Sequence, residues 1–253
     1  MLRATITYTV DPGHLDTLKV GASRYLPEIQ PGLRTEILAR ALGFNSWAAV
    51  RASGETRRTL CIPAALAFAK ERGLEIQPVD LHYTMAQATL LRIAGMTPLL
   101  HSDGYGSEYI SPGRDVIAEG ISPGTQAYRE RCRELIDAEF SRNRSELLSE
   151  KHGRGILCAM GVFSSLARTK TVGVRAPSSY TMKHVCERMF YDIGDDIMIP
   201  PSYVSNTEAI VAALDQGFPI DCNRYTLNVA IGIGWKSIKK VRAAREDGIA
   251  IAA

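Results

Sequence analysis

The chain of 253 residues is long enough to bury a substantial core, as one large domain or as two smaller ones. With 45% hydrophobic and 23% charged residues, its composition is that of a globular protein and excludes a disordered or fibrous one. The formal net charge of +3 is too small to require a nucleic-acid partner, so a local cluster of cations must make that case.

The five cysteines are widely spread, and no pair has Cys-x-x-Cys spacing. This spacing indicates neither a zinc knuckle nor a thioredoxin-type site, so we expect buried free thiols in a reducing compartment. The longest apolar run, residues 155–163, is far below the roughly 20 residues that span a bilayer. The first residues also lack the apolar region of a signal peptide, so the sequence predicts a cytoplasmic protein without membrane contact.

Residues 1–100 have the periodicity of a helical domain. Alternation over residues 3–10 indicates a short strand, and Asp11 with Pro12 then provides the cap and first turn of a helix that ends at Pro27. Four more helices follow, which the apolar spacing and the closing glycines place at 33–42, 47–52, 60–73 and 84–94.

Residues 37–52 have the outline of a helix-turn-helix, with Gly43 at the turn. A helix that reads DNA needs side chains that reach base edges, and this segment offers three polar candidates, Asn45, Ser46 and Arg51. Trp47 and Val50 have the character of core residues. An ordinary helical hairpin is the favoured interpretation, and a DNA-reading hairpin is the alternative.

Glycine, serine and proline dominate residues 101–124, which predicts a long loop or linker. We therefore expect an N-terminal helical domain over 1–100 and a C-terminal helical domain over 125–253. The longest helix is predicted over 125–151, where charges of both signs accompany one apolar stripe. A solvated outer face is the favoured interpretation of this helix, and a surface for a partner or for self-association is the alternative.

The remaining sequence also favours helices over strands. A buried helix is predicted at 155–167, and a strand at 225–231. Three further helices are predicted at 178–191, 206–216 and 237–245. The predicted fold class is therefore mainly α, a two-part helical protein with at most a few short strands.

Two clusters of basic residues are the best candidates for a binding surface. The first lies in a window without acidic residues and comprises Arg168, Lys170, Arg175, Lys183 and His184. The second lies on the last predicted helix and comprises Lys236, Lys239, Lys240, Arg242 and Arg245. If the fold brings the clusters together, they would form a positive surface for a phosphate backbone or for an acidic protein. Scattered, solvated cations are the alternative.

The sequence offers no convincing catalytic motif. His101, Ser102 and Asp103 have the residue types of a catalytic triad, but neighbours in one loop cannot converge as a triad must. Residues 232–237 lack the Gly-Lys pair of a P-loop. We therefore expect no catalytic residue, no metal site and no cofactor.

Two helix starts are predicted around Ser178 and Ser205. Each serine precedes a helical pattern, and Glu208 is close to the position for reciprocal capping of Ser205. Simple capping is the favoured interpretation of both serines. The alternative is that the exposed amide groups at these two helix ends bind an anion.

The stretch from Arg168 to Phe218 also carries an ordered set of short motifs, namely Arg168-Thr-Lys-Thr171, Ser179-Tyr180, Lys183-His184, Glu187, Tyr203-Val-Ser-Asn206 and Gly217-Phe218. This set resembles a Ser-Tyr-x-x-Lys-His … Tyr-Val-Ser-Asn … Gly-Phe module of uncharacterised accessory proteins of phages, plasmids and integrative elements. The chain departs from that module at Thr207, where the module has glycine.

The resemblance implies a biological setting, because accessory genes of mobile elements often encode regulators or inhibitors of host defence. We expect a non-catalytic protein that binds a host protein or a nucleoprotein complex, as a counter-defence inhibitor of the anti-CRISPR type. The first alternative is a DNA-binding transcriptional regulator that uses the 37–52 hairpin or the basic clusters. The second is an enzyme that acts on nucleic acid. Homo-oligomerisation is left open.

Overall fold

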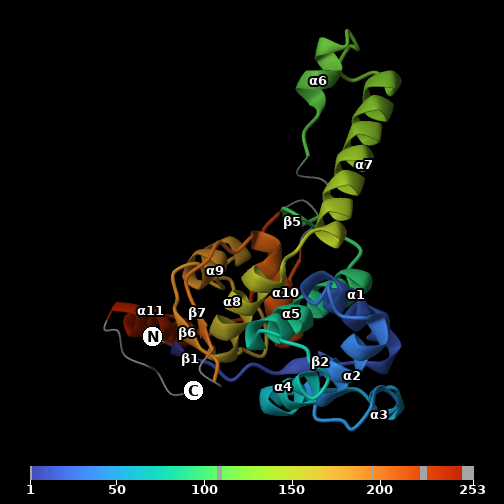
Figure 1. Ribbon diagram of the computed structural model, residues 1–253. Helices are drawn as coiled ribbons and strands as arrows, with labels where there is room; N and C mark the ends of the chain where they lie inside the picture. The colour runs from blue at the N-terminus through green and yellow to red at the C-terminus, as the bar shows by residue number, and fades with distance from the viewer. Residues whose placement is uncertain (1, 107–109, 195–196, 223–226, 247–253) are drawn as a thin grey trace.

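The chain is mainly α-helical, as the sequence predicts, in a computed structural model that describes residues 2–106, 110–194, 197–222 and 227–246. Figure 1 shows a rounded body from which one long helix projects as an arm. None of the helices in these residues is long and apolar enough to cross a lipid bilayer.

The body is built around α5 (Pro78–Met96), which contacts α1 (Leu15–Tyr25), α8 (Gly153–Ser164) and α10 (Asn206–Asp215). The helix begins six residues before its predicted start at 84 because Pro78 occupies its first turn, where a missing amide hydrogen costs nothing. Helices from both sides of the predicted linker therefore pack together. One cluster of buried apolar side chains extends from residue 4 to residue 241.

The close approach of α1 to α5 depends on Gly21. A Cβ atom at this position would lie 2.5 Å from the carbonyl oxygen of Thr84, so only glycine allows the two helices to come this near. Three smaller helices complete the N-terminal side of the body, α2 (Pro31–Ala41), α3 (Trp47–Ala52) and α4 (Ile62–Lys70). Their positions confirm the helices predicted at 33–42, 47–52 and 60–73.

The strands are two or three residues long and join distant parts of the chain. β1 (Leu2–Arg3) pairs in parallel with β6 (Tyr191–Asp192), which pairs antiparallel with β7 (Met198–Ile199). The other pairs are antiparallel: β2 (Tyr8–Val10) with β3 (Thr56–Arg58), β4 (Leu100–His101) with β5 (Gly104–Tyr105), and β8 (Ile220–Asp221) with β9 (Ala230–Ile231).

Two of the predicted strands need correction. The strand predicted over 3–10 is interrupted, since β1 and β2 pair with different partners and residues 4–7 between them form no strand. Of the strand predicted over 225–231, only β9 is a strand among the described residues, and residues 225 and 226 lie outside them.

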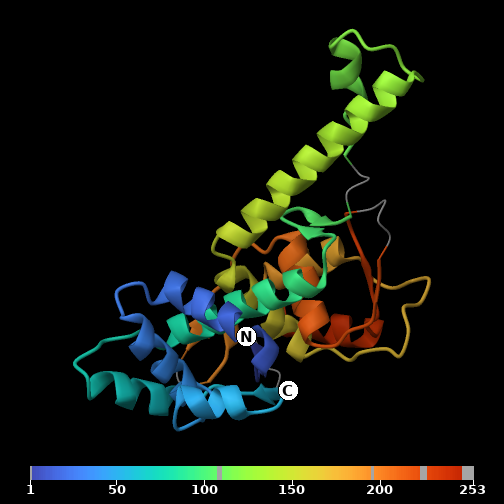
Figure 2. The ribbon, with the colours of Figure 1, turned by 90° about the vertical axis from the view of Figure 1, so that its right-hand side faces the viewer.

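The arm consists of α7 (Gln126–Ser149) and the short α6 (Gly113–Ala118), which packs at its far end. It projects from the body in two perpendicular views, Figures 1 and 2. Val116 is fully buried against this end but is not part of the main core cluster. The predicted linker over 101–124 thus leads from the body into the arm. The division into two separately folding domains stays a prediction, for which an experiment is given below.

All five cysteines are free, as expected, but the expectation that they are buried is only partly right. Cys158 and Cys186 are buried, and burial raises the pKa of the Cys158 thiol to about 12. Cys61 is exposed, and Cys132 and Cys222 are half-buried. Cys132 lies on the arm, where few side chains are available to cover it.

Candidate functional site

The first basic cluster divides between two places in the structure. Arg168, Lys170 and Arg175 lie in the exposed loop that follows α8. Lys183 and His184 lie on α9 (Ser179–Cys186), whose N-terminal cap is Ser178 as predicted. Sequence proximity thus grouped residues that the fold separates.

The loop after α8 lies beside the segment that leads into α11 (Trp235–Glu246). The amide of Thr169 donates a hydrogen bond to the carbonyl of Gly232 at 2.9 Å. The indole nitrogen of Trp235 donates to the carbonyl of Arg175 at 2.6 Å. These contacts hold the cations of the loop next to the beginning of α11.

Helix α11 presents its lysines on one side. Ile238 and Val241 are buried and face the body. At spacings of three and four residues, three exposed lysines share the outer side, Lys236, Lys239 and Lys240. Arg242 is exposed as well, whereas the side chain of Arg245 lies outside the described residues.

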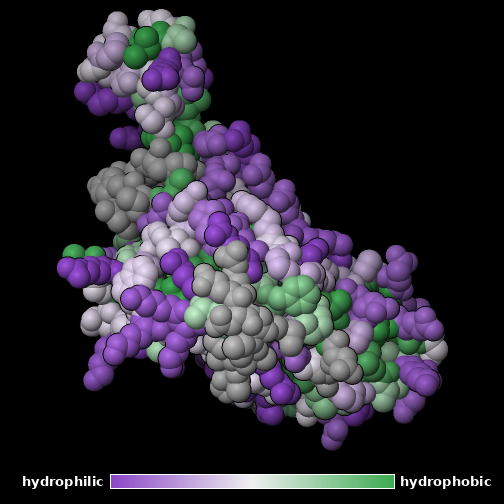
Figure 3. Space-filling view, turned by 90° about the vertical axis from the view of Figure 1, so that its left-hand side faces the viewer, coloured by the Kyte–Doolittle hydropathy of each residue, from purple (hydrophilic) through white to green (hydrophobic). Residues whose placement is uncertain are grey.

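We define the basic face as the exposed cations of the loop and the outer side of α11, Lys170, Arg175, Lys236, Lys239 and Lys240. The two segments that supply them, 168–184 and 222–245, contain no Asp or Glu. Figure 3 views the side of the molecule that carries α11, and hydrophilic side chains crowd one edge of it. Arg168 is left out because its guanidinium donates to the carbonyl of Gln216 at the end of α10, at 3.3 Å.

Lys183 has a different environment. Its side chain is only 11% exposed, and the ammonium lies 3.6 Å from a carboxylate oxygen of Glu187. It also lies 5.3 Å from the ring centre of Tyr180 and 4.9 Å from that of Tyr203. His184 is nearby, with its Nδ1 atom 2.7 Å from the other oxygen of Glu187. Lys183 is therefore held by specific contacts, unlike the lysines of α11.

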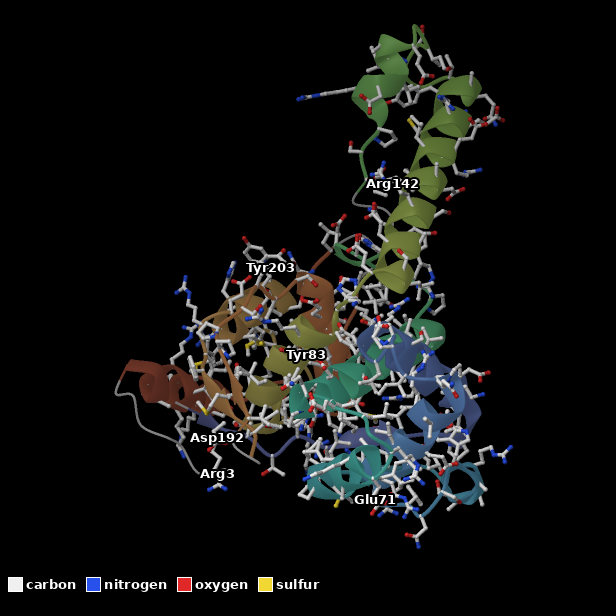
Figure 4. The ribbon with its side chains drawn as sticks, viewed as in Figure 1. Arg3, Glu71, Tyr83, Arg142, Asp192 and Tyr203 are labelled. Carbon is white, nitrogen blue, oxygen red and sulfur yellow. The ribbon has the colours of Figure 1, made fainter. Side chains whose placement is uncertain are left out.

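Lys183 lines a cavity of about 260 Å³, which we call the Lys183 cavity. Eight polar and aromatic residues border it, Ser102, Asp103, Tyr180, Lys183, Tyr203, Ser205, Asn206 and Asn228. They come from the β4–β5 turn, from α9, from the segment before α10 and the first residue of that helix, and from the segment before β9. Figure 4 labels Tyr203 at the upper edge of the body, close to α9.

The start of α10 borders this cavity and is fixed by buried polar contacts. The hydroxyl of Ser205 accepts from the amide of Glu208 at 3.1 Å, and the Glu208 carboxylate accepts from the Ser205 amide at 2.7 Å. This capping box confirms the predicted reciprocal cap. His152 lies 3.0 Å from the second carboxylate oxygen, and Gly155 leaves the room that the carboxylate occupies. Ser205 and Glu208 are thus engaged in holding the helix.

His101 ends β4, and Ser102 and Asp103 form the turn that leads to β5. The buried His101 ring accepts from the amide of Asp103 at 3.3 Å and donates from Nε2 to the carbonyl of Gly106 at 2.8 Å. Burial lowers the pKa of His101, which favours this neutral form. The hydroxyl of Thr207 donates to the His101 carbonyl at 2.5 Å. Thr207, where the module has glycine, thus ties α10 to the turn.

The 37–52 hairpin offers little surface for reading DNA. Trp47 and Val50 are buried, as predicted. The side-chain oxygen of Asn45 accepts from Arg40 at 3.2 Å, and Ser46 caps α3 by accepting from the amide of Ala49. Asn45 and Arg51 are both exposed, but Asn45 is held by Arg40 and Arg51 lies on a helix of only six residues.

Three residues of the cavity, Tyr180, Tyr203 and Asn206, are not predicted as site residues, because they lie at or beside two predicted helix starts. Tyr180 is 51% exposed and Tyr203 71% exposed, a large fraction for an aromatic side chain. A signal was present, since each tyrosine lies within a few residues of a cap and outside any apolar stripe. Their meeting around Lys183 depends on the tertiary fold.

Comparison with protein-family models, with curated proteins and with solved structures finds no match for this chain. Within the described ranges, no three His, Cys, Asp or Glu side chains lie close enough together to hold a metal ion. The basic face and the Lys183 cavity are therefore argued from their own geometry.

Proposed function

We propose that the protein is a non-catalytic binding protein whose basic face contacts the phosphate backbone of a nucleic acid, alone or within a nucleoprotein complex. One observation carries the proposal: backbone and indole hydrogen bonds hold two acid-free segments side by side, so that their cations share one surface. Closely spaced cations of this kind release condensed counterions when they bind phosphates, and this release drives association.

The position of the lysines on α11 strengthens the argument. Lys236 lies in the first turn of the helix, where the helix dipole adds partial positive charge, and Lys239 and Lys240 follow in the next turn. Cations are disfavoured at this end of a helix, and Arg175 and Lys170 lie nearby in the adjoining loop. Repulsion among these cations destabilises the free protein, and an anionic partner would offset it. The arrangement is therefore typical of a surface that binds an anion.

The salt dependence of duplex binding tests the proposal. Replacing Lys236, Lys239 and Lys240 with glutamine should lower the slope of log affinity against log salt by about two to three, since each phosphate contact contributes roughly 0.9. A matched control replaces three exposed lysines elsewhere, Lys19, Lys70 and Lys151, and changes the net charge equally. Fluorescence anisotropy across a salt series measures both slopes. Equal slopes in the two triple variants, or no binding at low salt, would contradict the proposal.

The resemblance to accessory proteins of mobile elements supplies a setting for this activity. We propose that the partner is a nucleoprotein complex of host defence, which the protein inhibits by contacting the phosphate backbone of a nucleic acid within it. A plaque assay in a CRISPR-immune host tests this step. The wild type should raise phage survival, and the triple variant of α11 should not. Equal survival with and without the protein would refute the counter-defence role and leave the binding proposal to the salt series.

A further inference from the structure

The Lys183 cavity lies outside the basic face and has a different chemistry. We propose that it binds a nucleobase, presented either by a free nucleotide or by an unpaired position in a strand. The cavity combines an open aromatic ring, a buried cation and a buried carbonyl acceptor within about 260 Å³. This volume is below the roughly 300 Å³ at which pockets for drug-sized ligands begin, so it suits one planar ring system.

The aromatic part of the site is Tyr203. Its side chain is 71% exposed at the edge of the cavity, which leaves the outer face of the ring open for stacking. Tyr180 is braced, because the ring of His184 meets it edge-on at 4.6 Å and Glu187 holds that histidine. Every base has a flat π-face, and exposed tyrosines are common platforms for unpaired bases.

The polar part of the site supplies both an acceptor and a donor. The amide nitrogen of Asn206 donates to the carbonyls of Leu227 at 2.8 Å and Asp103 at 3.3 Å, which fixes the orientation of the side chain. The amide oxygen of Asn206 is buried and has no hydrogen-bond partner among the described residues. A buried acceptor without a donor is costly, and a ring N–H group of a ligand would satisfy it.

Lys183 provides the donor. Its ammonium is 3.6 Å from Glu187, longer than a hydrogen bond, so this pairing leaves ammonium hydrogens for another acceptor. Neighbouring carbonyl and N–H groups are characteristic of the pairing edges of bases, which are accessible when a base is unpaired. The site therefore matches a nucleobase better than a bare phosphate, which would leave the Asn206 oxygen without a donor.

This inference is independent of the basic face, because none of the lysines of α11 borders the cavity. The two sites make different demands on a ligand. The basic face needs a charged backbone, whereas the cavity needs one exposed base. A strand with unpaired positions would satisfy both sites, and a mononucleotide only the second.

Calorimetric titration with each of the common nucleoside monophosphates and with a single-stranded oligonucleotide tests the proposal. Tyr203→Leu should weaken binding about 10-fold by removing the stacking ring, and Tyr203→Phe should restore it. Phe190→Leu is the control, since Phe190 is 42% exposed and does not border the cavity. Lys183→Met should also weaken binding, with Lys70→Met as its control. Circular dichroism confirms that each variant is folded.

The outcomes separate the sources of the base and the two sites. Saturable binding of a monophosphate that depends on Tyr203 supports a free nucleotide as ligand. Tyr203-dependent binding of the strand alone supports an unpaired base in a strand. Strand binding that survives Tyr203→Leu but is lost in the triple variant of α11 would overturn this inference while supporting the basic face. Absence of saturable binding by either probe at millimolar concentration would overturn it as well.

Discussion

The longest helix of the body and that of the arm differ in both polarity and burial: α5 carries few charged residues, whereas α7 is rich in charged residues of both signs. In the body, twelve of the 19 residues of α5 are buried, including the charged side chain of Arg92. In the arm, α7 is longer, at 24 residues, but buries only Asn143 and Leu147. The first helix is stabilised by the side chains packed around it. The second depends on its own backbone hydrogen bonds and on surface pairs such as Arg142 with Glu139. Figure 4 labels Arg142 on the arm.

The same contrast applies to charge. Asp215 on α10 has a fully buried side chain that accepts from Arg92 at 2.6 Å and from Arg57 at 3.4 Å. The arm has exposed pairs, in which water screens both partners. We therefore expect a buried ion pair of this protein to contribute more to the free energy of unfolding than an exposed one.

Asp215→Ala should cost about 3–5 kcal/mol of unfolding free energy, because it leaves the buried guanidinium of Arg92 without its carboxylate. The matched control is Asp16→Ala, which removes a 90% exposed carboxylate from its pair with Lys19 and should cost well under about 1 kcal/mol. Urea denaturation measures both values. Similar losses in the two variants would break the comparison.

His82 should make the body sensitive to acid. Burial lowers its pKa to about 4, and its Nδ1 atom lies 2.8 Å from the hydroxyl of the buried Tyr8. The unfolded chain takes up a proton near pH 6.5, but the folded chain resists it until about pH 4. The stabilisation is therefore complete above about pH 6.5 and is lost as the pH falls to about 4, by about 3 kcal/mol.

Urea denaturation at several pH values tests this expectation. His82→Gln removes the titrating group, so the variant should lose less stability than the wild type between neutral pH and pH 4. The difference between the two pH profiles isolates His82 from the other acid-sensitive groups. Parallel profiles would show that this histidine does not contribute.

Limited proteolysis tests whether the parts of the chain before and after residues 101–124 fold separately. The first cut should fall within 101–124, most readily at 119–124 near the tip of the arm, where most residues are exposed. The two fragments should stay together on size exclusion, because α5 packs on α8 and α10 across the cut. Separation into two folded fragments would instead support the two domains that the sequence predicts.

Local patterns allowed most of the helices to be predicted. The capping box of Ser205 and Glu208 and the proline and glycine boundaries of the N-terminal helices are signals within a few residues of chain. The pairing of β1 with β6 joins Leu2 to Tyr191, far apart along the chain, and two-residue strands have no readable alternation. The short α6 was missed because its surroundings have the composition of a loop.

The sites were less predictable for a related reason. The cations of the basic face could be listed from the sequence, but their meeting depends on hydrogen bonds between segments about 60 residues apart, such as Trp235 to Arg175. Lys183 was grouped with neighbours in the sequence, although its environment is set by Tyr203 and the β4–β5 turn. Burial of a single lysine is a tertiary property that no local pattern reports.

The smallest effect is expected at the tip of the arm. Arg131 on α7 donates to Glu119, just after α6, at 2.8 and 2.9 Å, and this exposed pair joins the two helices of the arm. Arg131→Gln should leave the unfolding midpoint unchanged, since global unfolding is governed by the body. It should nevertheless speed the first proteolytic cut, because α6 would detach more often from α7 in a local opening.

Arg142→Gln is the control, as Arg142 pairs only with Glu139 and Glu146 of its own helix among the described residues. A shift of the midpoint in Arg131→Gln would show that the arm contributes to the stability of the body, and the contrast between the two regions would fail.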